Sequence, residues 1–170
     1  EPSSSTWLES LIAPFADPKT AMCYGGQRGT KLSKFGEVED FKRMFGDSRM
    51  EMRHYFANNA NSAIRRDLWA DYPFDEKLTG LEDIDWAKHW MTKDYKVIYE
   101  PAATLYHIHE ETWRQVRNRY YREAVAARHL GILTRRNLPE YVAMELGYTL
   151  ADFFRALKPG DNPVAARLPV

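Results

Sequence analysis

The sequence predicts an α/β protein in which a mixed, partial sheet is flanked by helices and followed by a C-terminal helical hairpin. Three observations support this fold class. A short helical pattern leads into an apolar run closed by two glycines, two more strand-like segments follow a central helical pattern, and two long helical patterns occupy the last third. Alternating helices and buried strands are typical of α/β layering. With 170 residues, 44% of them hydrophobic, the chain is long enough for one core and short for two.

The first elements are expected to be a helix and a buried strand. Over residues 3–15, serines and a threonine that can cap a helix precede apolar side chains at helical spacing, and Pro14 and Pro18 stop the pattern. The following run, KTAMCYGGQ, is continuously apolar and short, which favours a buried strand over a helix. A further helix is expected around EVEDFKRMF.

The middle of the chain alternates between bends, helices and strands. HYFANNANSAIRRDLW opens like a strand and then becomes rich in asparagine, which suits a bend, and one or two helical turns follow in RRDLWADYP. Residues 83–94 carry an apolar stripe at helical spacing. After them, YKVIYEP and ATLYHIH predict two strands separated by Pro101.

The last third predicts two long helices that end at Gly131 and at Pro159-Gly160. The chain is therefore expected to have three parts: residues 1–111 with the sheet, residues 112–158 with the helical pair, and an extended tail over 159–170.

Charge and cysteine content limit the function classes. Twenty-four basic residues balance 24 acidic ones, so there is no whole-chain electrostatic case for binding nucleic acid. Cys23 is the only cysteine, which excludes a disulfide framework within the chain and indicates a buried, inert thiol. No run of about 18 apolar residues and no signal peptide pattern is visible, so a cytoplasmic protein is expected.

Three carboxylates gather at the start of the helix in KLTGLEDIDWAKHW. Glu82, Asp83 and Asp85 follow the flexible Gly80. Carboxylates at a helix N-terminus are stabilised by ~0.3–1 kcal/mol each by the helix dipole, which is one explanation. The other is a general base, because burial against large aromatic neighbours such as Trp86 would raise the pKa of a carboxyl group toward the working range.

Two further groups of side chains could bind ligands. His107 and His109 lie two residues apart in a predicted strand, so both rings project from one face, where they could bind a metal or simply end a strand at the surface. The amides of three asparagines could hold sugar or nucleotide hydroxyls or could form turns; they are Asn58, Asn59 and Asn61.

The first of the two C-terminal helices is strongly basic. Residues 112–170 carry ten basic and five acidic side chains, and five of the arginines lie between Thr112 and Gly131. A solvated basic face is the default interpretation. The alternatives are that this face binds phosphate groups, or that Thr112–Arg136 makes a peripheral contact with an anionic membrane, at its inner face.

Four segments in this order resemble the C-terminal part of the catalytic domain of family 2 glycosyltransferases, which are inverting enzymes of the GT-A fold. They are WLESLIAPFADPKTAMCYGGQ, FANNANSAIRRDLW, YPFDEKLTGLEDIDWAKHW and YKVIYEPAATLYHIH. The resemblance covers roughly residues 1–125 and is strongest to bacterial rhamnosyltransferase-like members that build surface polysaccharides.

The resemblance implies roles for individual residues. The acidic pair of the family falls on Glu82 and Asp83, with Asp83 as the catalytic base, and Gly80 and Trp86 would shape the acceptor pocket. The metal-ligating histidine falls on His107, with His109 as a second candidate, and the metal would be Mg²⁺ or Mn²⁺. The segment that lines the sugar and acceptor side of the family's active site corresponds to the residues Asn58, Asn59 and Asn61.

The implied substrates are a UDP-, dTDP- or GDP-linked sugar donor and a saccharide or lipid-linked saccharide acceptor. In the family, a nucleotide-binding half with an Asp-x-Asp motif precedes the matched segments, and Glu1-Pro2 resemble the residues directly after that motif. We therefore expect this chain alone to bind nucleotide poorly and not to turn over.

Two other function classes compete with this interpretation. One is a non-catalytic binding or assembly module that docks a membrane or a partner through the basic helices. The other is a small metallohydrolase using His107 and His109, which is disfavoured because no third histidine occurs at ligand spacing.

Overall fold

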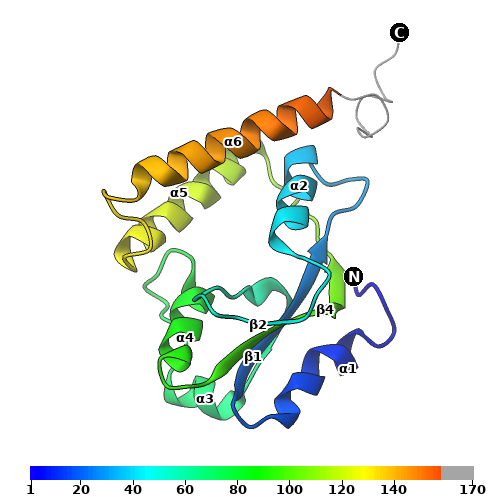
Figure 1. The fold of residues 1–170 in the computed structure, drawn as a ribbon, viewed down its shortest axis with the longest axis vertical. Helices are drawn as coiled ribbons and strands as arrows, with labels where there is room; N and C mark the ends of the chain where they lie inside the picture. Colours follow the sequence, from blue (N-terminus) through cyan, green and yellow to red (C-terminus); the bar gives the residue numbers. More distant parts are fainter. Residues whose placement is uncertain (158–170) are drawn as a thin grey trace.

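The computed structural model describes residues 1–157, and the expected tail over 159–170 lies outside this part. A four-stranded mixed sheet in the order β2-β4-β1-β3 forms the centre (Figure 1). β1 pairs with β4 in parallel and with β3 in antiparallel orientation, and β2 pairs with β4 in antiparallel orientation. The strands are β1 (Thr20–Arg28), β2 (Met50–Glu51), β3 (Ser62–Ile64) and β4 (Lys96–Tyr106). The expectation of an α/β fold with a mixed sheet is confirmed.

Helices cover the sheet on both faces. The helices before the C-terminal pair are α1 (Trp7–Ile12), α2 (Phe35–Met44), α3 (Arg66–Asp71) and α4 (Glu82–Met91). On one face, Leu11 of α1 packs with Cys23 and Ile98. On the other face, the larger core joins Trp86 and Trp90 of α4 to residues of β1 and β4 and to α2 and α3.

Strand β1 is buried along almost its whole length, as its continuous apolar sequence predicts for a central strand. Its side chains alternate between the two cores, with Met22 and Tyr24 in the larger one and Cys23 in the smaller one. Burial raises the pKa of the Cys23 thiol to about 12, so the expectation of an inert, buried thiol is confirmed.

Two strands were expected around Pro101, and the structure instead has one strand with an interruption. The β1–β4 ladder passes from the Gly25–Glu100 pair to the Gln27–Leu105 pair, so the residues around Pro101 bulge out of register. Proline lacks the N–H that a ladder requires, which explains the position of the bulge. The amide of Asn61 donates to the carbonyl oxygens of Ala103 at 2.8 Å and Gly26 at 2.9 Å, which fixes the bulge against β1.

The segment before β3 also differs from the expected strand. Residues 54–58 are irregular, and the asparagine-rich part forms a 3₁₀ turn over Asn59–Asn61. The side-chain oxygen of Asn58 caps this turn by accepting from the Ala60 N–H at 3.1 Å. The asparagines therefore satisfy backbone groups in a bend, as their composition suggested.

The two long C-terminal helices are α5 (Trp113–His129) and α6 (Leu138–Ala156), which confirms the predicted pair. Thr112 begins α5 with a capping box, in which its side chain and that of Gln115 bond to each other's backbone N–H groups. Helix α5 contacts the sheet-bearing part, since Thr79 Oγ1 donates to the Arg122 carbonyl at 2.8 Å. No helix within residues 1–157 is long and apolar enough to cross a membrane.

Helix α6 is attached to α2 through ion pairs. Arg43 bonds both oxygens of Asp152, at 2.7 and 2.9 Å, and its guanidinium lies over the Tyr148 ring. Arg155 reaches Glu39, a buried carboxylate of α2, at 2.9 Å. Bidentate arginine–carboxylate pairs are among the stronger polar contacts in proteins, so this network sets the position of α6.

Replacing Arg43 with alanine is expected to loosen α6 without unfolding the sheet. Loss of charge-assisted hydrogen bonds in a partly buried site should lower the local opening free energy of α6 by about 1–3 kcal/mol. Hydrogen exchange of α6 amides, compared with amides of β1, measures this. Arg49→Ala is the matched control, because Arg49 makes a longer pair with Glu100, at 3.6 Å. Unchanged exchange in α6 of the Arg43 variant would contradict the assignment.

Candidate functional site

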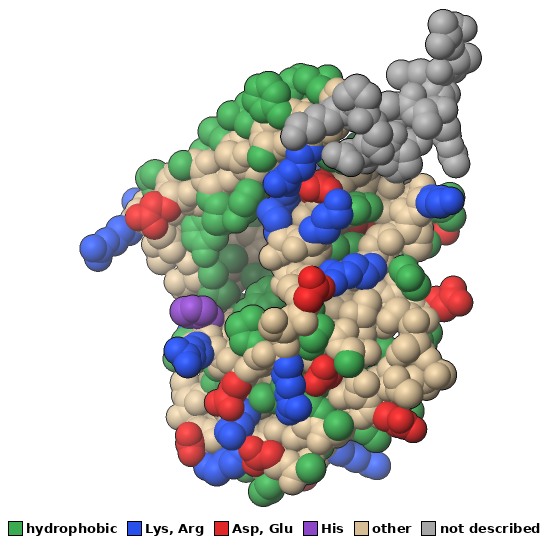
Figure 2. All heavy atoms as spheres, turned by 45° about the vertical axis from the view of Figure 1, so that its right-hand side comes forward, with side chains coloured by type: hydrophobic (Ala, Val, Ile, Leu, Met, Phe, Trp, Pro, Cys, Tyr) green, Lys and Arg blue, Asp and Glu red, His purple; other side chains and the backbone are tan. Residues whose placement is uncertain are grey.

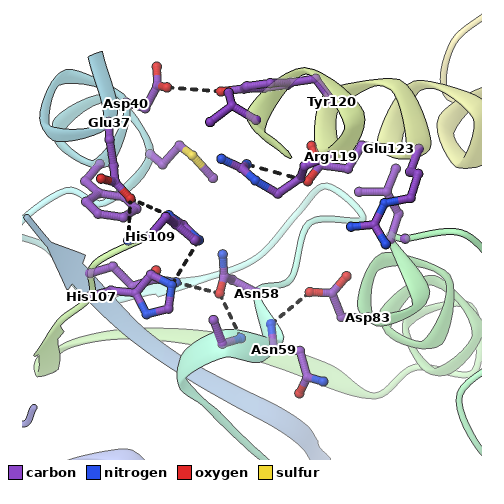
Figure 3. Close-up of a pocket in the computed structure, with 18 of the residues that line it drawn as sticks. Glu37, Asp40, Asn58, Asn59, Asp83, His107, His109, Arg119, Tyr120 and Glu123 are labelled. Carbon is purple, nitrogen blue, oxygen red and sulfur yellow. Dashed lines mark hydrogen bonds and ion pairs between the residues drawn. The ribbon is translucent and has the colours of Figure 1, made fainter. Parts of the chain in front are cut away.

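A cleft of about 520 Å³ lies where five segments meet. It is bounded by α2, by residues 56–60, by the loop that leads into α4, by the residues after β4, and by α5. Figure 3 shows that its polar side chains come from all of these segments and point toward one another. Residues that are distant in the sequence thus form one concave surface with several titratable groups, which is typical of a binding or active site.

Asp83 is held at the floor of this cleft, in the first turn of α4. Its Oδ2 accepts from the Asn59 backbone N–H at 2.8 Å and its Oδ1 accepts from the Ile84 N–H at 2.9 Å. Burial raises the pKa of Asp83 above its ordinary value, and these backbone hydrogen bonds partly oppose the shift. A carboxylate of this kind is oriented and partly desolvated, which suits a general base.

The loop before Asp83 brings the backbone close to α5. Gly80 lines the cleft. A Cβ atom added to it would lie 3.5 Å from Cγ of Glu123, which is an ordinary van der Waals distance. Leu81, the N-cap residue directly before α4, has φ 61°, a left-handed conformation that costs a non-glycine residue about 1–2 kcal/mol. Glu82 also lines the cleft, next to Asp83.

The predicted substrate-binding residues divide into two groups. Asn58 and Asn59 line the cleft, as Gly80 does. Asn61 and Trp86 are instead buried in the fold. The side-chain amide of Asn61 donates hydrogen bonds to the carbonyl oxygens of Gly26 and Ala103, and its oxygen accepts one from the Trp7 indole. The Trp86 indole N–H donates to the Tyr72 carbonyl at 2.7 Å. The structure therefore gives both of these residues architectural contacts away from the cleft.

His107 and His109 face each other at the opposite side of the cleft, just after β4. Their Nε2 atoms lie 3.0 Å apart, and Nδ1 of His109 bonds to the Glu37 carboxylate. Burial, followed by the nearby His109, lowers the pKa of His107, so its imidazole is favoured in the neutral form that binds metals. The second oxygen of Glu37 is buried without a hydrogen-bond partner among the described residues.

The two imidazoles are the side chains of the cleft that could contribute donors to a metal ion. Their Nε2 atoms are within hydrogen-bond distance of each other, so both would be close enough to act as donors to one ion. The Glu37–His109 bond has the pattern of an outer-shell carboxylate that orients a metal-binding histidine. Within residues 1–157, however, no three histidine, cysteine, aspartate or glutamate side chains are grouped to hold an ion.

Helix α5 forms a wall of the cleft, which the sequence alone did not indicate. Its lining side chains recur at helical spacing; they are Trp113, Val116, Arg119, Tyr120, Arg122 and Glu123. Arg119 bonds to Glu111 at 3.0 Å and lies 3.8 Å from Glu123, and burial raises the pKa of Glu123. The spacing of Trp113, Val116, Tyr120 and Glu123 was the signal in the sequence for a helix face directed at the cleft.

Acidic side chains outnumber basic ones in the cleft. Glutamates and aspartates contribute six of its lining residues, against one lysine and two arginines. A phosphate-bearing ligand would therefore meet an acidic wall unless it entered together with cations.

Comparisons with known proteins give no relatives for this chain: it matches no family model, no curated protein and no solved structure.

Proposed function

We propose that this chain belongs to a nucleotide-sugar-dependent, inverting glycosyltransferase of the GT-A type and carries its acceptor side and catalytic base. The observation that carries the proposal is the shared cleft. Asp83 at the start of α4 and His107 at the end of β4 line the same cavity, although 24 positions separate them in the sequence. These are the two positions to which the sequence resemblance assigns the base and the metal ligand.

Asp83 would act as the base that takes the proton of the incoming acceptor hydroxyl. Its backbone hydrogen bonds from Asn59 and Ile84 hold the carboxylate in place, and burial keeps its pKa above that of a surface aspartate. An inverting transfer needs one such base, because the hydroxyl attacks the anomeric carbon directly while the nucleoside diphosphate leaves on the opposite side. Glu82, Asn58, Asn59 and Gly80 would line the acceptor side.

A divalent cation, Mg²⁺ or Mn²⁺, would offset the negative charge that develops on the leaving diphosphate. His107, and second His109, are the residues proposed to hold it, with Glu37 orienting His109. Mg²⁺ is a hard cation that keeps its waters and prefers oxygen ligands, so of the two ions Mn²⁺ is the better candidate for imidazole donors. The acidic character of the cleft is a second reason to expect that donor phosphates bind only with a cation.

The direct test is calorimetric titration with UDP, dTDP and GDP, each with Mn²⁺. It should be done on this chain and on the full-length product of its gene. We expect one of the three nucleotides to bind to the full-length product in an Mn²⁺-dependent manner. The nucleobase of that nucleotide identifies whether the sugar donor is UDP-, dTDP- or GDP-linked. If no nucleotide binds to either protein, the glycosyltransferase proposal fails.

The histidine pair has its own test in Mn²⁺ binding. We expect His107→Ala to lower Mn²⁺ affinity in the presence of the preferred nucleotide by about 10–100-fold, measured by electron paramagnetic resonance of free Mn²⁺. His109→Ala should have a similar or smaller effect. His129→Ala is the matched control, because His129 is exposed in the last turn of α5. Equal affinity of the His107 variant and the control would remove His107 from the metal site.

A further inference from the structure

Helix α6 presents a continuous apolar face to solvent. Successive residues of an α-helix are turned by about 100°, which places eight apolar residues on one side of α6; they are Pro139, Val142, Ala143, Leu146, Leu150, Phe153, Phe154 and Leu157. No charged residue falls within this side. Its large side chains are 50–63% exposed, and no residue of α6 is buried. Figure 2 shows hydrophobic side chains gathered along the upper edge of the molecule, over α6.

The opposite side of α6 is the one that contacts the protein. Asp152 and Arg155 make the ion pairs with α2, and Tyr148 lies under the Arg43 guanidinium. The large apolar side chains nearest to this side, Tyr141 and Tyr148, are the less exposed ones at 37% and 40%. The ion pairs thus fix the rotation of the helix, so that its apolar face is turned outward.

The width of this face distinguishes between possible partners. A helix–helix seam covers a narrow stripe of about two residues in seven. The outward face of α6 spans about 120°, and the Phe153 and Phe154 rings lie edge to face with their centroids 5.7 Å apart, so the face is one broad apolar surface that is wider than such a seam. A lipid surface covers a face of this breadth, because it adapts to the whole exposed side of a helix lying in its plane.

Basic side chains stand at the beginning of this face. Arg135 and Arg136 lie in the connection that leads into α6, and Arg128 lies in the last turn of α5. All three are exposed and form no ion pair with any residue between 1 and 157. The two acidic residues of the first half of α6, Glu140 and Glu145, lie outside the apolar sector on either side of it. Unpaired, exposed arginines close in sequence to a helix with an exposed apolar face are complementary to anionic lipid headgroups.

We infer that α6 docks this protein on an anionic membrane surface, with its outward apolar face at the level of the acyl chains and Arg135 and Arg136 among the headgroups. This moves the membrane contact expected from the sequence, through Thr112–Arg136, mainly onto α6, because the inner side of α5 is occupied as a wall of the cleft. The inference is independent of the proposed sugar transfer. If no nucleotide binds, the sugar-transfer proposal fails but the membrane inference is unaffected. If the protein does not bind vesicles, the membrane inference fails but the sugar-transfer proposal is unaffected.

The test is co-sedimentation of the full chain with vesicles of phosphatidylcholine, with and without a quarter of phosphatidylglycerol. We expect binding to the anionic vesicles. The double substitution Leu150→Gln and Phe154→Gln should weaken it at least about tenfold. Arg135→Gln with Arg136→Gln should weaken it by about fivefold per arginine on anionic vesicles only.

The matched control is Leu8→Gln with Ile12→Gln in α1, where the two side chains are 55% and 50% exposed. It should bind vesicles as the unmodified chain does. Far-UV circular dichroism shows whether each variant keeps its helices, and sedimentation equilibrium reports self-association. The inference is overturned if the unmodified chain does not bind anionic vesicles, or if the α6 and α1 variants bind equally. A dimer that the α6 substitutions dissociate, without vesicle binding, would instead assign the face to a second copy.

Discussion

Replacing Asp83 with asparagine is expected to lower the rate of sugar transfer by about 10²–10⁴-fold in the full-length product of the gene, which is the usual contribution of a positioned general base. The amide has nearly the shape of the carboxylate but cannot accept the proton of the acceptor hydroxyl. It can still accept one of the two backbone hydrogen bonds from Asn59 and Ile84, so the free energy of unfolding should change by no more than about 1 kcal/mol.

Asp85→Asn is the matched control for this experiment. Asp85 lies in the same first turn of α4, but its carboxylate accepts a hydrogen bond from the Tyr72 hydroxyl at 3.0 Å and does not line the cleft. It should retain transfer activity. If Asp83→Asn also retains activity, Asp83 is not the base, and a non-catalytic binding or assembly module becomes the better interpretation.

The raised pKa of Asp83 adds a pH signature to the same prediction. The folded protein binds this proton more tightly than the unfolded chain does, so ionised Asp83 costs stability at neutral pH, and the cost is relieved as the pH falls through the raised pKa. Activity should change in the opposite sense, because only the ionised carboxylate accepts a proton. The acidic limb of the rate profile of kcat/KM should therefore lie above the ordinary aspartate range.

Replacing Gly25 with alanine is expected to destabilise the fold by at least about 3 kcal/mol. A Cβ atom at this position would lie 1.8 Å from the Ala103 carbonyl oxygen and 2.6 Å from the Asn61 amide nitrogen. The first contact is with backbone, which cannot move aside without opening the β1–β4 ladder at its bulge. Urea unfolding followed by tryptophan fluorescence measures the change.

Gly147→Ala supplies the matched comparison. Gly147 lies in the middle of α6, and an added Cβ atom would meet nothing within 4 Å. Alanine loses less backbone entropy than glycine in a helix, so this variant should gain about 0.5–1 kcal/mol of helix stability. If the two variants unfold at the same urea concentration, the close approach of β1 and β4 at Gly25 is not what requires glycine there.

Much of the fold followed from periodicity in the sequence. The continuous apolar run of β1 predicted a buried strand, and the apolar stripe after Glu82 predicted α4, because both patterns depend only on nearby residues. The short β2 and the bulge at Pro101 were not predicted, because they depend on which strands pair. The path of α5 across the cleft depends on tertiary contacts such as the hydrogen bond from Thr79 to the Arg122 carbonyl.

The same distinction applies to the site. Asp83 and His107 could be singled out because a helix start and a strand end are local features. The sequence could not separate Asn58 and Asn59, which line the cleft, from Asn61, which is buried only three positions after Asn58. Glu37, the partner of His109, is 72 positions away and lies on another element.

The bulge in β4 also constrains how this chain can diverge in evolution. Side chains alternate along a strand, so the number of residues between Glu100 and Leu105 sets which side of the sheet His107 and His109 occupy. An insertion or deletion of one residue there would turn Tyr106, the last residue of β4, to the other side of the sheet and displace the histidines that follow it. When homologous sequences are aligned, we therefore expect the parity of this gap to be kept wherever both histidines are kept.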